Sequence, residues 1–287
     1  MNEIFERFAK NCPIPVALRA TLERLFAPEK LDDWFKLNAD KQYTKELLFS
    51  TIFDLMSLVV FKVFPSVNAA YQSKTETIAT SISSVYNKLN GLEPAVAAKL
   101  VNDTGRELAS LVEGLKAPRN SLLTGYRVKM LDGNCIAKTE HRLEVLRHTN
   151  AGPLPGKSLA IYDHALDMVV DVFPCEDGHA QERSLLKAVL PTINANDVIV
   201  ADRNFCVQDF LSDIGLASGY FAIRLHERLP IEPLDMIRSV GETDTGEVLE
   251  QNVKIKDSKG EHKCVVMLIT LRLKKATRDG DKRMQIV

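Results

Sequence analysis

The sequence predicts an α/β protein of the α+β kind, in which a helical region over residues 1–120 precedes a mixed sheet with helices of its own. Before residue 120, apolar residues recur at the three- and four-residue spacing of amphipathic helices, and no strand pattern interrupts them. After Gly125, segments rich in β-branched and aromatic residues alternate with short helical patterns. The change in pattern near Gly125 therefore predicts an all-helical part followed by a part that contains a sheet.

The helical region contains three strong patterns. The segment 47–64 is apolar on nearly all sides, which is typical of a buried helix. Segment 75–89 has an apolar stripe at helical spacing and ends at Gly91, a residue common after helix ends. Glu93 and Pro94 open a further helix, because proline suits the first helical position.

The residues around 67–89 allow two interpretations. They hold two helical patterns joined by a short polar turn, as in a helix-turn-helix DNA-binding motif. The positive charge there is limited to Lys74 and Lys88, which offers few contacts to phosphates. The sequence therefore favours a helical bundle that packs or dimerises.

The second half predicts the element order β-β-β-α-β-α-β. Three strands before the first helix argue against a doubly wound dinucleotide fold, and the sequence has no GxGxxG motif. Two further strand-like runs after Glu227 predict a separate β-hairpin elaboration. The segments are strands Tyr126–Ala137, Ser158–Leu166 and Met168–Cys175, with a turn at Asp167; helix Gln181–Ile193; strand Asp197–Phe205; helix Cys206–Leu216; strand Tyr220–Leu225; and the later strands Val248–Ile255 and Lys263–Leu273.

Composition excludes several classes of protein. The 287 residues include 37 Lys plus Arg and 38 Asp plus Glu, and 45% are hydrophobic, so global disorder is excluded. Five widely spaced cysteines favour neither a zinc ribbon nor a disulfide framework. The first residues lack the pattern of an export signal, and the most apolar stretch is far short of the roughly 18 consecutive residues of a membrane span. We expect a soluble cytoplasmic protein with no membrane partner.

Two aspartates are the strongest candidates for chemistry. Strand alternation places Asp132 on the face of Val128 and Met130, and it places Asp202 on the face of Val198 and Val200. If these strands are parallel neighbours, the two carboxylates lie side by side at one sheet edge. A divalent cation such as Mg²⁺ or Mn²⁺ would relieve their repulsion. The alternative is that each caps a helix or forms a turn, for which Asp132 and Gly133 are a suitable pair.

Three segments resemble a known family: MLDGN (130–134), HAQER (179–183) and VIVADRNF (198–205). They resemble the DDE transposases of bacterial insertion sequences, in the subfamily with a β-rich insertion in a ribonuclease H-like core. The resemblance extends over about 118–230. It implies a helical DNA-binding or dimerisation domain at 1–120, a ribonuclease H-like core at 121–230, and an incomplete β-rich insertion at 231–287.

The resemblance implies a function and a site. The family's first and second catalytic aspartates fall on Asp132 and Asp202, which would bind Mg²⁺ or Mn²⁺. The implied reactions are phosphodiester hydrolysis at transposon ends and strand transfer, so the partners are DNA terminal repeats and target DNA, with a possible homodimer. The protein would then be associated with the nucleoid.

Other residues have weaker support. Arg203 and Asn204 are candidate contacts to DNA or to the metal site, or else they fix the turn after their strand. His179 and Glu182 match a family position beside the site, although Glu182 also suits a helix start and His179 a cap. Another candidate group is a basic run that suits DNA-backbone contact or an edge strand protected by charge, and it comprises Arg272, Lys274 and Lys275.

One departure from the family is large. Its third carboxylate is a glutamate on a later helix, within a Tyr-x2-Arg-x3-Glu-x6-Lys pattern that this sequence lacks. Glu227 and Glu250 are available, but neither has the flanking pattern. We therefore expect a C-terminally truncated transposase that lacks the final catalytic helix and does not transpose DNA alone. The alternatives are a non-catalytic DNA-binding or dimerising remnant that interferes with an intact transposase, and a different ribonuclease H-like nuclease.

Overall fold

A computed structural model describes residues 3–40, 46–136, 156–175, 181–256, 258–260, 263–278 and 280–287. The chain forms two compact units, Met1–Glu107 and Leu108–Val287. The first is helical and the second contains two sheets with helices, so the predicted α+β class is confirmed. The segments 121–230 and 231–287, which the resemblance assigns to separate domains, belong to one compact unit.

The first unit is built from helices whose starts follow from the sequence. Prolines open three of them, because a proline at the first position gives up no helical hydrogen bond. Ser66 and Ser81 cap two others by accepting a hydrogen bond from a main-chain N–H of the first turn. The helices are α1 (Glu3–Asn11), α2 (Pro13–Leu25), α3 (Pro28–Asn38), α4 (Phe49–Val60), α5 (Val67–Gln72), α6 (Ile82–Gly91) and α7 (Pro94–Gly114), the last of which crosses into the second unit.

Two expectations for the helical region are wrong. Helix α4 is buried on one side only: Ile52 and Leu55 are fully enclosed, whereas Val60 and Phe61 are about two-thirds exposed at its end. The helix expected from residue 75 begins at Ile82, after Ser81 caps it. Residues 73–81 therefore separate α5 from α6, far more than the three- or four-residue turn of a helix-turn-helix motif.

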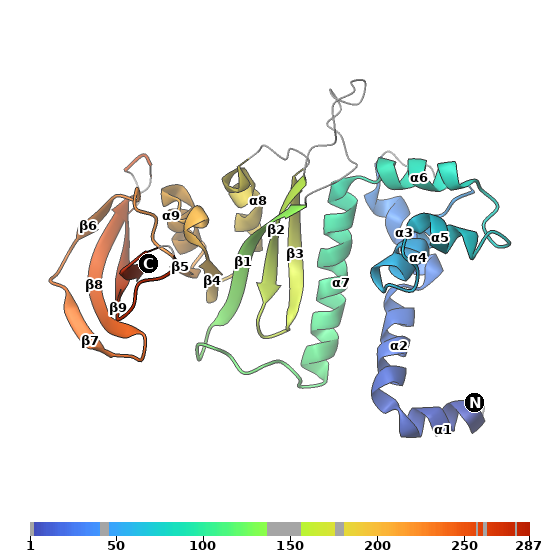
Figure 1. The fold of residues 1–287 in the computed structure, drawn as a ribbon, viewed down its shortest axis with the longest axis horizontal. Helices are drawn as coiled ribbons and strands as arrows, with labels where there is room; N and C mark the ends of the chain where they lie inside the picture. The colour runs from blue at the N-terminus through green and yellow to red at the C-terminus, as the bar shows by residue number, and fades with distance from the viewer. Residues whose placement is uncertain are drawn as a thin grey trace. The chain divides into compact units, whose positions relative to one another are not determined.

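The first sheet has five strands in the order β3-β2-β1-β4-β5 (Figure 1). Strands β1, β2 and β3 are antiparallel neighbours, whereas β4 and β5 run parallel to β1. Asp167 has the left-handed backbone (φ 55°) expected of the turn between β2 and β3. The strands are β1 (Arg127–Ile136), β2 (Gly156–Asp163), β3 (Met168–Cys175), β4 (Asp197–Ala201) and β5 (Tyr220–Ile223).

The connections between these strands are shorter helices than the sequence predicts. The helix expected over 181–193 is divided into a 3-10 turn, η2 (Glu182–Leu185), a short α8 (Leu186–Val189) and a second 3-10 turn, η3 (Leu190–Thr192). Pro191 explains the end of α8, because it lacks the N–H that an α-helix would use there. Strand β4 stops at Ala201 and is followed by the 3-10 turn η4 (Arg203–Phe205) and by helix α9 (Gln208–Leu216).

The second sheet corrects the expected β-hairpin elaboration. It has five strands: β10, β9, β8 and β6 lie in that order, and β7 also pairs with β8. Helix α9 lies between the two sheets (Figure 1), and its Leu211 and Ile214 share one core with Ile199 of the first sheet and Val253 of the second. The strands are β6 (Ile231–Pro233), β7 (Arg238–Glu242), β8 (Gly246–Lys256), β9 (Lys263–Leu273) and β10 (Arg283–Ile286).

Main-chain hydrogen bonds join the two sheets at β10. Ile223 and Val287 exchange a pair of N–H···O bonds of 2.8 and 2.9 Å, and the Leu225 N–H donates to the Gln285 carbonyl at 2.8 Å. The second sheet is therefore attached to the edge of the first at the end of β5. Over the residues described, no helix has the length and apolar character needed to cross a membrane.

Candidate functional site

The strand register aligns the two candidate aspartates. Strands β1 and β4 are parallel neighbours, and their last paired residues are Leu131 and Ala201. Asp132, within β1, and Asp202, directly after β4, are the residues that follow this last pair, so they lie next to each other where the pairing ends. The packed core takes Leu131 and Ala201 on one face. By strand alternation, both carboxylates emerge on the other face.

Asp132 lies within a strand rather than in a turn. Strand β1 continues to Ile136, and Asp132 is paired with Ala160 of β2. The Asp132 side chain is exposed, and its Oδ1 accepts a hydrogen bond of 2.8 Å from the N–H of Gly133. The alternative that Asp132 and Gly133 form a turn is therefore wrong. Among the described residues, the Asp132 Oδ2 has no hydrogen-bond donor.

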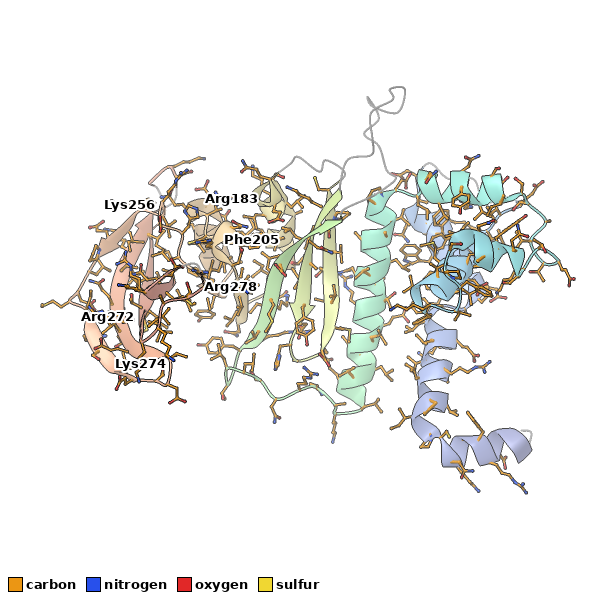
Figure 2. The ribbon with its side chains drawn as sticks, viewed as in Figure 1. Arg183, Phe205, Lys256, Arg272, Lys274 and Arg278 are labelled. Atoms are coloured by element: carbon orange, nitrogen blue, oxygen red, sulfur yellow. The ribbon has the colours of Figure 1, made fainter. Side chains whose placement is uncertain are left out.

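Asp202 caps the turn after β4. Its Oδ1 accepts a hydrogen bond of 2.8 Å from the Asn204 N–H. This is the capping role that the sequence analysis gave as the alternative to metal binding. Phe205, 1% exposed, anchors η4 in the core, and the Arg183 Nε donates to the Asn204 carbonyl at 2.8 Å (Figure 2). The cap uses one carboxylate oxygen. Within the described part of the chain, Oδ2 has no hydrogen-bond donor.

Glu182 lies against the strand position that follows Asp132. A Cβ atom added to Gly133 would be 2.6 Å from the Glu182 Cδ, so the carboxylate occupies the space that a side chain at this position would fill. Gly133 points away from the Asp132 face, which places Glu182 behind the strand rather than beside the two aspartates. His179 lies outside the described residues.

The carboxylates that remain available suit a hard divalent cation. Mg²⁺ is commonly held by one or two carboxylates and completes its coordination with waters and phosphate oxygens. Asp132 and Asp202 offer two exposed carboxylates on adjacent strands, so they fit that requirement. Over the described ranges, no group of three His, Cys, Asp or Glu side chains is arranged to hold a metal ion. Two protein ligands are thus what these residues provide.

The other two glutamates considered for the third position lie elsewhere. Glu250, on β8, forms an ion pair of 3.0 Å with Arg238. Glu227 is exposed in the turn that follows β5.

Cys206 follows η4 and is buried, and burial raises the pKa of its thiol. Cys206 therefore stays protonated and packs as a small apolar residue.

Arg224 is a residue at this edge that the sequence analysis missed. Ile223 pairs with Ala201, so Arg224 stands abreast of Asp202, and its N–H donates to the Ala201 carbonyl at 3.3 Å. Its guanidinium Nη2 forms an ion pair of 2.8 Å with the Asp281 carboxylate. Its position directly after the apolar run YFAI is the same signal that identified Asp202. Arg203 is exposed and has no ion pair within the described residues.

The basic run on β9 is partly neutralised by the protein's own acids. Arg272 lies 3.2 Å from a Glu247 oxygen, and Lys274 lies 3.2 Å from a Glu242 oxygen. Lys275 is exposed without an ion pair to a described residue. Arg272 is paired on both sides, with Glu247 of β8 and Arg283 of β10, so it does not lie at a sheet edge, and Lys274 and Lys275 follow the end of β9.

Another cluster missed in the sequence lies at the opposite end of β4. Asp197 and Lys129 form a buried ion pair of 2.6 Å, with side chains 3% and 7% exposed. The Asp197 carboxylate also accepts the Asn194 N–H at 2.8 Å, and Lys129 donates to the Thr192 carbonyl at 3.2 Å. All of these groups are satisfied internally, so this cluster stabilises the fold rather than forming a site.

Comparisons with known proteins identify one distantly similar solved structure. No family model and no curated protein matches the chain. Among solved structures, the chain is similar to a piggyBac transposase seen by cryo-EM in a synaptic complex with hairpin DNA, at 11% identity and a TM-score of 0.38. The alignment covers 92% of this chain and 63% of that protein, so the chain spans less than two thirds of its length.

Proposed function

We propose that this chain is of the transposase type and that its Asp132 and Asp202 form the divalent metal site that such proteins use for phosphodiester hydrolysis and strand transfer on DNA. The observation that supports this most is the register: the two aspartates quoted in the family resemblance directly follow Leu131 and Ala201, the last paired residues of the parallel strands β1 and β4. These residues are 70 positions apart in the sequence, and only this strand pairing brings them together.

The chain's own residues have separate roles in this proposal. Asp132 and Asp202 hold the metal ion through their exposed oxygens, and Mg²⁺ or Mn²⁺ supplies charge stabilisation at the reacting phosphate. The cap from Asp202 to the Asn204 N–H fixes that carboxylate at the strand end. Arg183 holds η4 in place through the Asn204 carbonyl. Arg203 is exposed beside the carboxylates and contacts the DNA backbone.

The remaining predicted residues have supporting roles. Glu182 packs behind Gly133 and positions β1. Lys275 contacts DNA outside the metal site. Arg272 and Lys274 contact it there too when phosphate replaces their carboxylate partners. Transposon ends and target DNA are the proposed substrates, a second copy of the chain is a proposed partner, and the nucleoid is the proposed location.

Metal binding tests the site directly. We would titrate Mn²⁺ into the wild-type chain, into Asp132→Asn and Asp202→Asn, and into Asp244→Asn, an exposed aspartate between β7 and β8 that serves as the control. We expect heat of binding from the wild type and the control and its loss in the two site variants. Equal binding by all four proteins, or by none, would contradict the proposal.

A second function is favoured by one observation. In the residues that the structure describes, no third carboxylate joins Asp132 and Asp202. A chain of this kind could retain DNA binding without cleavage and interfere with an intact transposase. Nicking of supercoiled plasmid with Mn²⁺ separates the two functions: nicking lost in Asp202→Asn supports the enzyme, whereas DNA binding without nicking supports the non-catalytic protein.

A further inference from the structure

The loop between β9 and β10 carries cations that no described residue neutralises. The segment 274–282 has four bases and two acids. Lys275, Arg278 and Lys282 are exposed, and none of them forms an ion pair with a described residue. In contrast, Arg272 on β9 and Lys274 at the start of the loop face carboxylates of β8 and β7. Three exposed cations without an ion pair to a described residue therefore lie within one loop, and Arg283 at the start of β10 adjoins them.

Hydrogen bonds hold the described part of the loop. The Leu273 N–H donates to the Lys282 carbonyl at 3.0 Å, which closes the hairpin at its base. Within the loop, the Thr277 N–H donates to the Asp281 carbonyl at 2.9 Å, and the Thr277 hydroxyl oxygen accepts from the Asp281 N–H at 3.0 Å. Because these bonds constrain the main chain at residues 273, 277, 281 and 282, a ligand would lose less conformational entropy on binding there.

An ion pair ties this loop to the aspartate edge. The Asp281 carboxylate lies 2.8 Å from the Arg224 guanidinium, and Arg224 stands abreast of Asp202 at the end of β5. Adjacent strands are separated by about 5 Å, so Asp132, Asp202 and Arg224 occupy successive positions along roughly 10 Å of the sheet edge. In Figure 2, Arg278 lies on the side of the second sheet nearer the first, whereas Arg272 and Lys274 lie farther from it.

From this arrangement we propose that the β9–β10 loop binds the phosphate backbone of duplex DNA next to the two-aspartate edge, through Lys275, Arg278 and Lys282. Three exposed, separated cations without an enclosing pocket suit a repeating anion better than a single small phosphate. Arg224 is the positioning residue, since it holds the loop at the edge through Asp281. The inference rests on the proposed function in that it names the surface that holds the substrate of the same site.

The test measures DNA binding without metal, so that it does not depend on the carboxylates. A fluorescent duplex is titrated in EDTA at several salt concentrations against the wild type and the triple variant Lys275→Gln, Arg278→Gln and Lys282→Gln. The control removes three other charges of the same unit: Lys254→Gln, Lys256→Gln and Lys259→Gln. Each lost phosphate contact lowers the slope of log affinity against log salt by about 0.9, so we expect a decrease of roughly 2 to 3 for the loop variant.

The expected affinity loss of the loop variant is at least tenfold at low salt, with the control within about twofold of the wild type. Equal losses in both triple variants, or a wild-type chain that binds no duplex, would overturn the proposal. A loop variant with wild-type DNA affinity would also overturn the proposal. If that variant still binds Mn²⁺, the proposed metal site is not contradicted. Loss of Mn²⁺ binding with an intact loop effect would instead contradict only the proposed enzyme.

The positioning role of Arg224 has its own readout. Arg224→Asp should weaken duplex binding, and the exchange Arg224→Asp with Asp281→Arg should restore most of it, because the ion pair is re-formed with its direction reversed. An exchange variant that folds with the wild-type thermal midpoint but binds as weakly as Arg224→Asp would show that the ion pair does not position the loop.

Discussion

The two ends of strand β4 carry the same kind of side chain in opposite surroundings. Asp197, at its start, is buried, faces the Lys129 ammonium at 2.6 Å and accepts a main-chain N–H. Asp202, directly after its end, is exposed and uses one oxygen for a cap. The comparison shows that residue type alone does not separate a structural carboxylate from one that can bind a ligand. The difference lies in how many of its oxygen lone pairs remain without a hydrogen-bond donor.

The largest expected effect is at the buried end. Asp197→Ala leaves the Lys129 ammonium enclosed without its carboxylate, so we expect the free energy of unfolding to fall by about 3–5 kcal/mol. Urea denaturation of the wild type and the variant measures this difference in the free energy of unfolding. The double variant Lys129→Met with Asp197→Leu should recover most of the loss, because an apolar pair needs no compensation. A loss below about 1 kcal/mol for Asp197→Ala would remove the distinction between the two ends.

A smaller effect is expected beside Asp132. Gly133→Ala introduces a Cβ that would overlap the Glu182 carboxylate, whose nearest atom is 2.6 Å away. The carboxylate is the far end of a flexible side chain and can move, so we expect a loss of about 1–2 kcal/mol. Thermal unfolding of Gly133→Ala, Glu182→Ala and the double variant gives the coupling between them. Glu182→Ala should relieve the cost of Gly133→Ala, and additive effects would refute the contact.

At the exposed end, stability and ligand binding should separate. Asp202→Ala removes the cap on the Asn204 N–H and should cost about 1 kcal/mol. Asp202→Asn keeps a capping oxygen and should cost less than that, yet both variants should lose Mn²⁺ binding in calorimetry. If Asp202→Asn instead destabilises as strongly as Asp197→Ala, the open end of β4 is structural and the comparison fails.

Asp209 gives the smallest effect and a case between the two ends. Its carboxylate is exposed but accepts the Ser258 N–H at 2.8 Å and the Ser258 hydroxyl at 2.9 Å, and these bonds lower its pKa. A lowered folded pKa stabilises the protein above the unfolded value of about 3.9, and the contribution disappears as pH falls through the folded value. Asp209→Asn should therefore lower the thermal midpoint slightly at pH 6 and not at pH 2. A difference that persists at pH 2 would contradict this origin.

The sequence predicts the order of elements in the core better than their ends. Alternating β-branched residues identify β1 through β5 and place Asp132 and Asp202 on matching faces, because strand alternation is a local property. The parallel pairing of β1 with β4 joins residues 70 apart. Periodicity within a strand does not indicate which strands pair, so the sequence analysis could only assume that these two strands are parallel neighbours. The division of 181–193 into short turns depends on Pro191 and on packing against the sheet.

The polar contacts were harder to predict than the strands. Arg224 and Asp281 are 57 positions apart, and Lys129 and Asp197 are 68 apart, so no local spacing relates them. The second sheet has more strands than the sequence predicts for a related reason: β6, β7 and β10 are short, and they form by pairing with β8 and β9. Their sequences carry weak strand patterns of their own.

The junction between residues 223–225 and 285–287 has a consequence for how the second unit is made. Contacts between segments so distant in sequence form late, because the intervening chain must be closed into a loop first. During synthesis, the edge of the first sheet stays open until residues 285–287 have left the ribosome. Until then the growing chain presents an unpaired strand, and the interval before β10 arrives is when it is most exposed to association with other chains.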